Sequence, residues 1–258
     1  MINFKKYFTT KKGFIPFITA GDPSIDASLK YLNTLVEAGA TLIEIGIPFS
    51  DPIAEGATIM EASARALSNG ATLKRVFELV SMFRENNKDF PLVFMTYLNP
   101  VYAYGYDKFF KNMKDLNMQG IIIPDLPYEE KHEVSDVASK YDVAVISLIA
   151  PTSKDRIKML ASEAEGFVYL VSSLGVTGVR DVITTDIDGM AKEIKKYTDI
   201  PVCVGFGIKS PETAKKMCNV ADGAIVGSAI VNIIAKYGDK AEGFVYDFAK
   251  SIVDEINK

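Results

Sequence analysis

The feature that most constrains the fold is the alternation of short apolar runs with amphipathic stretches along all 258 residues. Eight runs each lead into Gly, Pro, Asn, Asp or Ser, as buried strands often do. They are FIPFITAGD, TLIEIGIP, LVFMTYLNP, GIIIPDLP, VAVISLIAP, FVYLVSS, PVCVGFG and GAIVGSA. Between them lie stretches of helical period, such as SLKYLNTLVEAGA, YEEKHEVSDVASKY and SPETAKKMCNVAD. The pattern predicts eight consecutive strand–helix units.

Strands this uniformly apolar are expected to be covered on both faces, as in a parallel sheet. Eight units favour a closed (β/α)8 TIM barrel over the alternative, an open doubly wound sheet. No low-complexity linker divides the chain, so we expect residues 1–258 to form one domain. The N-terminal INFKKYF predicts a short extra helix that caps the barrel bottom.

Composition excludes several classes of protein. The sequence is 48% hydrophobic and 24% charged with a net charge of -4, which suits a compact core and an ordinary solvated surface. It has no basic stripe for nucleic acid and no apolar run near the roughly 18 residues of a membrane span. Cys203 and Cys218 lack metal-site spacing and are expected to be buried reduced thiols. These features predict a cytoplasmic protein that binds neither nucleic acid nor membrane.

One carboxylate interrupts the second apolar run. Period-2 alternation places Leu42, Glu44 and Gly46 on one face of the strand, and three isoleucines on the other. The isoleucines belong against helices, so Glu44 is expected to point into the barrel mouth. There desolvation would raise its pKa toward neutrality and suit it to proton transfer. The alternative is a structural carboxylate paired with a base, but none of the eight runs contains Lys or Arg.

Glycines recur at three late strand ends, in GVTG (175–178), GFG (205–207) and GSA (227–229). Glycine lets backbone N–H groups approach an anion closely, and Ser228 opens a predicted helix whose N-terminus adds donors. TIM barrels often bind phosphate after strands seven and eight. The pattern favours a phosphate site over turn chemistry alone.

Aromatic or apolar residues fall at or near several strand ends, where together they would line a slot for a flat ring. They are Phe17, Ile59, Tyr97, Tyr169 and Phe206. No apolar run carries the lysine of a Schiff-base aldolase, and the one histidine, His132, lies in a solvated-looking helix. A histidine-ligated metal site and a Ser-His-Asp triad are therefore not expected, and carboxylates must do the proton work.

At this point the sequence resembles the alpha subunits of tryptophan synthase. The resemblance covers nearly the whole chain, through GFIPFITAGDPS, EIGIPFSDP, PDLPYEE, SSLGVTG, GFGIKSPE and GSAIV. It implies retro-aldol cleavage of indole-3-glycerol phosphate to indole and glyceraldehyde 3-phosphate, without a cofactor. It also implies an α2β2 complex with a β subunit that carries pyridoxal phosphate and receives indole through a channel.

The resemblance assigns roles to individual residues. It implies that Glu44 is the principal acid and base, and that Glu55 stabilises positive charge on the indole N–H. Thr177 would lie in a mobile loop at 173–187 that closes over the substrate. The remaining implied assignments are Phe17, Tyr97, Tyr169 and Phe206 for the indole slot, Gly178, Gly207, Gly227 and Ser228 for phosphate, and Asp51, Pro52, Asn99 and Pro100 for the loops that contact the β subunit.

The chain departs from the family in one loop. The family sequence A-D-G-P is AEGA here, so that Glu55 replaces Asp and Ala57 replaces Pro. This leaves open a second hypothesis, a catalytically weak subunit kept as an allosteric binding partner. A third is another phosphate-binding barrel enzyme, such as an isomerase of a phosphorylated sugar.

Overall fold

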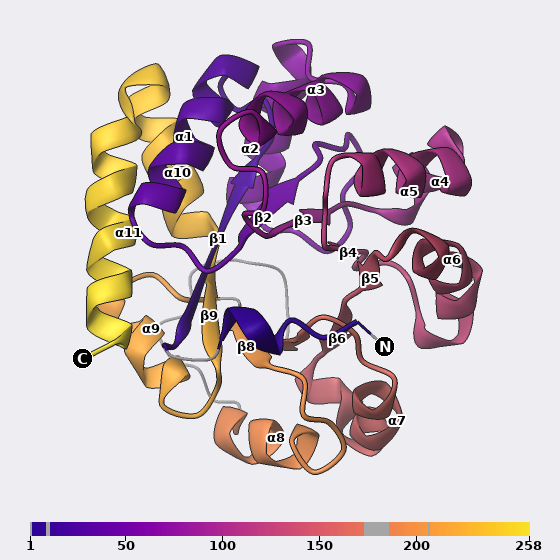
Figure 1. The fold of residues 1–258 in the computed structure, drawn as a ribbon. Helices are drawn as coiled ribbons and strands as arrows, with labels where there is room; N and C mark the ends of the chain where they lie inside the picture. The colour runs from indigo at the N-terminus through magenta and orange to yellow at the C-terminus, as the bar shows by residue number, and fades with distance from the viewer. Residues whose placement is uncertain (1, 9–10, 173–185, 206) are drawn as a thin grey trace.

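The computed structural model describes residues 2–8, 11–172, 186–205 and 207–258. The described strands form one parallel sheet in the order β5-β4-β3-β2-β1-β9-β8-β7-β6 (Figure 1). They are β1 (Gly13–Thr19), β2 (Ile43–Gly46), β3 (Leu92–Met95), β4 (Gly120–Ile122), β5 (Ala144–Val145), β6 (Ser147–Ile149), β7 (Val168–Val171), β8 (Val202–Gly205) and β9 (Gly223–Val226).

The expected fifth strand is split in two, so the sheet has nine strands where the sequence predicted eight. Ala144 pairs with Gly120 of β4, whereas Ser147 pairs with Val168 of β7, and only Ile146 lies between β5 and β6. Barrel strands are tilted and staggered, so one run of residues meets its two neighbours at different heights. The chain itself therefore joins the two ends of the sheet, and the predicted TIM barrel is confirmed.

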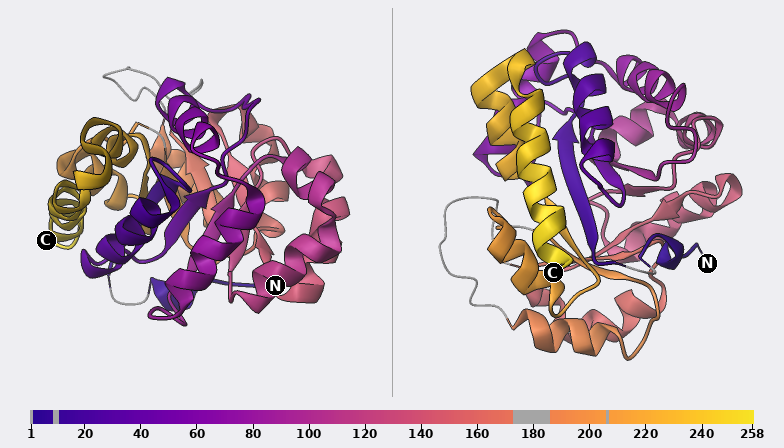
Figure 2. Two further views of the ribbon diagram at one scale, coloured as in Figure 1. Left: turned by 90° about the horizontal axis from the view of Figure 1, so that it is seen from above. Right: turned by 60° about the vertical axis from the view of Figure 1, so that its left-hand side comes forward.

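Helices surround the strands (Figure 2). The α-helices are α1 (Ile25–Glu37), α2 (Ala57–Ser68), α3 (Leu73–Arg84), α4 (Leu98–Tyr104), α5 (Tyr106–Asp115), α6 (Lys131–Ala138), α7 (Ile157–Ser162), α8 (Ile187–Ile194), α9 (Pro211–Cys218), α10 (Ser228–Tyr237) and α11 (Glu242–Ile256). The 3-10 turns are η1 (Lys5–Tyr7), η2 (Tyr128–Glu130), η3 (Ser139–Tyr141), η4 (Pro151–Arg156) and η5 (Gly238–Lys240).

Several helices begin where a polar side chain caps them. The hydroxyl of Ser24 accepts a hydrogen bond from the Ala27 N–H at 3.1 Å, and the Asp186 carboxylate accepts one from Gly189 at 2.9 Å. These caps satisfy N–H groups that the first helical turn leaves without partners.

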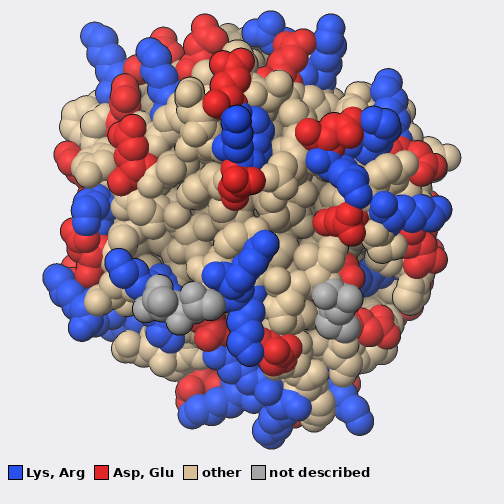
Figure 3. Space-filling view, in the orientation of Figure 1, with Lys and Arg blue, Asp and Glu red and all other residues tan. Residues whose placement is uncertain are grey.

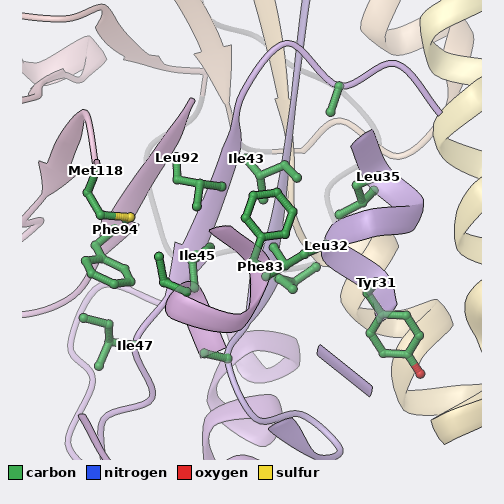
Figure 4. Packing of buried hydrophobic residues seen from close by; sticks show 14 of the residues in the cluster. Tyr31, Leu32, Leu35, Ile43, Ile45, Ile47, Phe83, Leu92, Phe94 and Met118 are labelled. Carbon is green, nitrogen blue, oxygen red and sulfur yellow. The ribbon is translucent and has the colours of Figure 1, made fainter. Parts of the chain in front are cut away.

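The two faces of β2 pack as the alternation predicts. Ile43, Ile45 and Ile47 join a cluster outside the strands that includes Leu32 of α1 and Phe83 of α3 (Figure 4). Leu42, on the opposite face, belongs to a separate cluster that includes Val93 of β3 and Ile122 of β4. The strand parity that turns the isoleucines outward is what turns Glu44 inward.

The N-terminal segment covers one end of the barrel interior. Phe4 is 2% exposed, its N–H donates to the Gly166 carbonyl at 2.9 Å, and its ring packs 6.2 Å from that of Phe167. A Cβ on Gly120, the first residue of β4, would lie 3.4 Å from this ring. The expected cap at the barrel bottom is present, as the single 3-10 turn η1 preceded by a buried phenylalanine.

The surface is mixed in charge. Around the upper rim of the face in Figure 3, acidic and basic side chains are interspersed. Within the described ranges, no helix is both long and apolar enough to cross a membrane. Cys203 and Cys218 are buried free thiols, as expected.

Candidate active site

Glu44 is a buried carboxyl group in the barrel interior. The residue is 1% exposed, and neither carboxyl oxygen has a hydrogen-bond partner among the described residues. Burial raises the pKa of Glu44 to about 8, and the charge of Glu55 adds to this rise. Burial and a nearby negative charge both disfavour the carboxylate. Glu44 is therefore mainly a neutral acid near pH 7, with a proton to give.

Glu55 lies in the loop between β2 and α2, two residues before the helix begins. Burial raises the pKa of this carboxyl group to about 7. Its effect on Glu44 means that the two groups, eleven positions apart in the chain, interact electrostatically. Near neutrality the site thus holds one group that is mainly protonated and one that is close to half ionised.

Two aromatic residues are neighbours of Glu44, and the ring of each lies over a glycine. Phe17 is the β1 residue paired with Glu44, and a Cβ on Gly46 would lie 2.5 Å from its ring. A Cβ on Gly205 would lie 2.3 Å from the Tyr169 hydroxyl oxygen. Glu44 also contributes to raising the pKa of Tyr169, after burial itself. Sequence reasoning placed both rings near the acid but missed the two glycines that make room for them.

Ile59 packs on one of these two rings, that of Phe17. It packs in a small cluster with Phe17, Ala62 of α2 and Val231 of α10, and Met95 of β3 packs against the cluster. The last three residues were missed because each has the apolar spacing of ordinary helix or strand core. They differ from ordinary core residues only in that all three pack in the same cluster as Phe17.

Tyr97, which is expected to line the indole slot, also contacts the loop that carries Glu55. It is 2% exposed, and its hydroxyl oxygen accepts hydrogen bonds from the N–H groups of Ile53 and Ala54 at 3.2 and 2.9 Å. Its ring packs against Phe49 with centroids 5.4 Å apart. The Tyr97 side chain therefore contacts the loop that carries Glu55 at several points.

Three of the expected phosphate residues, Gly207, Gly227 and Ser228, lie after neighbouring strands, since β8 pairs with β9. Gly207 has a φ of +73° and open space where a Cβ would be, so this backbone conformation favours glycine. Gly227 is the N-cap of α10, which begins at Ser228 as predicted. The Ile230 N–H already donates to the Gly227 carbonyl at 2.9 Å. The N–H groups before it, at the very start of the helix, are of the kind that can bind an anion. The assignments to Thr177, Gly178 and Phe206, and residues 173–185 of the expected mobile loop, lie outside the described residues.

The residues expected at a partner surface are accessible, but not all lie in loops. Asp51 is exposed in the β2–α2 loop, whereas Asn99 and Pro100 lie in the first turn of α4. The expectation of a second loop was wrong here, because the Asp125 carboxylate accepts the Leu98 N–H at 2.9 Å and the chain turns into a helix directly after Tyr97.

A separate cavity of about 170 Å³ lies outside the strands, between the start of α6 and α7. Its cationic groups already have partners: Lys131 donates to the Glu163 carbonyl at 2.8 Å, and Arg156 lies 2.6 Å from Glu129. The carboxyl pair and its aromatic walls are elsewhere, so the barrel interior is the better candidate for chemistry.

Comparison with known proteins identifies the family to which the chain belongs. Residues 4–256 match the family model for the tryptophan synthase alpha chain. The tryptophan synthase alpha chain of Lacticaseibacillus casei is 46% identical over 245 residues, 95% of this chain and 92% of the relative. That of Caldanaerobacter subterraneus subsp. tengcongensis is 49% identical over 232 residues, 90% of this chain and 88% of the relative.

Solved structures give the same answer. Tryptophan synthase subunit alpha from Legionella pneumophila has a TM-score of 0.88 at 33% identity, covering 99% of both chains. A chain from the tryptophan synthase a2b2 complex of Pyrococcus furiosus has a TM-score of 0.85 at 36% identity, covering 95% of this chain and 99% of that one. With family model, relatives and fold in agreement over nearly its whole length, this chain belongs to the tryptophan synthase alpha chain family.

Proposed function

We propose that Glu44 and Glu55 carry the proton chemistry by which this chain, a carbon–carbon lyase of its family, cleaves indole-3-glycerol phosphate to indole and glyceraldehyde 3-phosphate. The observation that carries the proposal is the position of Glu44. This carboxyl group has no described hydrogen-bond partner, Phe17 is its neighbour on β1, and it interacts electrostatically with Tyr169, inside a barrel whose described strands contain no lysine.

The steps follow from the protonation states. Glu44, with its pKa raised to about 8, gives a proton to indole C3, and the ring nitrogen takes up the positive charge. The resulting carboxylate removes the proton from the glycerol hydroxyl next to C3. The carbon–carbon bond then breaks, its electron pair restores the indole ring, and the hydroxyl carbon becomes the aldehyde. Glu55, in its ionised form, stabilises the charge on the indole nitrogen.

The phosphate of the substrate would bind where the ends of β8 and β9 meet. Gly207, Gly227 and Ser228 offer backbone N–H groups there, and the first turn of α10 adds the positive end of its helix dipole. The indole ring would then extend toward Glu44 along Phe17 and Tyr169.

The proposed assembly is an α2β2 complex, as named for the relative from Pyrococcus furiosus. Asp51, Pro52, Asn99 and Pro100 would form the contact surface. Its support is the exposed apolar surface beside them, since Ile53 is 75% exposed and Tyr102 66% exposed. The proposed location is the cytoplasm, because two buried free thiols suit a reducing compartment.

The alternative of a catalytically weak subunit rests on Glu55 and Ala57. Ala57 is the first residue of α2, a position where proline is favoured because its φ is already helical. Alanine there leaves the preceding loop freer to adjust to the longer Glu55 side chain. The charge of Glu55 raises the pKa of Glu44, so the longer side chain still lies near the principal acid, and this proximity supports an active enzyme.

The substitution Glu44→Gln tests the proposal, because glutamine keeps the shape but cannot exchange the proton. We expect kcat for indole-3-glycerol phosphate cleavage, measured with the β subunit present, to fall about 100-fold or more. Glu85→Gln, at an exposed position after α3, is the matched control and should leave kcat unchanged. A Glu44→Gln variant that keeps more than about a tenth of the wild-type kcat would refute the role of Glu44. A wild type without turnover would favour the weak-subunit alternative.

A further inference from the structure

The loop that carries Glu55 has little support of its own. Residues 48–55 are neither helix nor strand. No backbone–backbone hydrogen bond joins them to the rest of the described chain. The loop begins after Ile47, whose N–H donates to the Met95 carbonyl at 2.9 Å, and it ends at Gly56, the N-cap of α2. A segment of this kind needs side-chain contacts to hold a carboxyl group in one place.

Tyr97 supplies these contacts at both ends of the loop. Near the start, its ring packs against Phe49 at an angle of 35°. Near the end, its hydroxyl oxygen accepts the N–H groups of Ile53 and Ala54, the two residues that precede Glu55. These two bonds use both acceptor positions of the phenol oxygen, so its own proton remains free to be donated.

The support is rigid because of where Tyr97 is attached. It follows β3 by two residues, and Met95 of β3 pairs with Gly46 of β2, the strand that carries Glu44. A continuous path of strand pairing and hydrogen bonds therefore runs from Glu44 through β2 and β3 to Tyr97, and from its hydroxyl to the residues before Glu55. This path fixes the backbone that precedes Glu55 relative to the strand that carries Glu44.

From this geometry we propose that Tyr97 is a positioning residue, whose hydroxyl fixes the distance between Glu55 and Glu44 through the backbone of Ile53 and Ala54. The inference rests on the proposed function of the carboxyl pair. It gives Tyr97 a task that differs from lining the indole slot, because the task depends on the hydroxyl oxygen and not on the ring face. Misplacement of a reacting group by about 1 Å can cost about 100-fold in rate.

The test uses Tyr97→Phe, which removes the hydroxyl and keeps the ring packed on Phe49. In the complex with the β subunit, we expect kcat to fall about 10-fold or more while KM for indole-3-glycerol phosphate changes less than about threefold. Backbone amide exchange at Ile53 and Ala54 should become faster. Tyr104→Phe is the matched control, since its hydroxyl accepts a hydrogen bond from Asn112 at 2.8 Å and does not touch the loop. Unchanged kcat in Tyr97→Phe, or a rise in KM alone, would overturn the inference.

A double-mutant cycle with Glu55→Gln separates this inference from the proposed function. If Tyr97 acts through Glu55, the loss caused by Tyr97→Phe should largely disappear in the Glu55→Gln background. If Glu55→Gln lowers kcat but the two losses multiply, Tyr97 acts elsewhere and only the positioning role fails. If Glu55→Gln keeps the wild-type kcat, the proposed function of Glu55 fails, and the positioning role fails with it.

Discussion

At the residue scale, Glu44 combines an ionisable group with apolar surroundings. Its carboxyl group shares the barrel interior with Phe17 and Tyr169, and no described residue offers it a hydrogen bond. Such a group costs stability when charged, and it persists where function requires it. The same burial that makes Glu44 an acid near neutrality therefore makes the folded state sensitive to pH.

The direction of this pH dependence follows from the two protonation states. The pKa of Glu44 is about 8 in the folded protein against a value of 4.5 for an ordinary glutamate. Below the unfolded pKa, Glu44 is protonated in both states and the folded protein keeps its full stability. As pH rises through the folded pKa, this stability is lost, because the carboxylate is favoured in the unfolded chain and disfavoured in the buried site. We expect Glu44→Gln to raise Tm by at least about 2 °C near pH 8.5 and to change it little at pH 5. Calorimetry across this range checks the prediction, and an equal effect at both pH values would contradict it.

At the element scale, α2 is held at both ends. Its first residue follows the loop that carries Glu55, and its last turn carries Arg65. The Arg65 guanidinium donates two hydrogen bonds, at 2.9 and 2.8 Å, to the carboxylate of Asp22, which is 2% exposed. Ile59 and Ala62, between these ends, pack against Phe17. The helix thus links the loop after β1 to the loop after β2.

We expect Arg65→Met to lower the free energy of unfolding by about 1–3 kcal/mol, because it leaves a buried carboxylate without its partner. Adding Asp22→Asn should recover part of this loss. Lys74→Met is a suitable control, since Lys74 lies 3.8 Å from Glu78 in a pair whose lysine side chain is 85% exposed. Urea unfolding measures all three. If Arg65→Met costs no more than Lys74→Met, the pair does not hold α2.

At the scale of the whole molecule, the two ends of the barrel differ. Phe4 and the turn η1 cover one end of the barrel interior, where β4 begins. Loops and helices that follow the strands cover the other end, and Ile53 and Tyr102 are exposed there. We expect a partner that receives indole to bind at this second end, because active sites of TIM barrels open at the carboxyl ends of the strands.

Hydrogen exchange with and without the β subunit should show protection at residues 51–53 and 98–102 in the complex. We expect Ile53→Asp to weaken the complex about 10-fold, since it would place a charge where the complex is expected to bury an exposed apolar side chain. Phe244→Asp is the control, because Phe244 is 48% exposed in α11, on the other side of the molecule from α4 in Figure 1. Protection confined to residues 2–8 would contradict the proposed surface.

The sequence by itself determined the order of strands and helices, the outward isoleucines of β2 and the inward direction of Glu44. Period and residue type carry these features, because each depends on neighbours a few positions away. The start of α10 at Ser228 was predictable for the same reason. The catalytic and binding roles of the site residues stay predictions, and the positions of Thr177, Gly178 and Phe206 lie outside the described residues.

Only the tertiary structure decided how distant segments meet. It split the fifth strand between β4 and β7, turned Asn99 and Pro100 into a helix, and joined Arg65 to Asp22. It also brought Glu55 within the electrostatic reach of Glu44 and placed the Tyr97 hydroxyl, 44 and 43 positions away in sequence, on the N–H groups of Ile53 and Ala54. Hydrogen bonds and charge interactions of this kind depend on the stagger and closure of the barrel, which no local pattern of residues specifies.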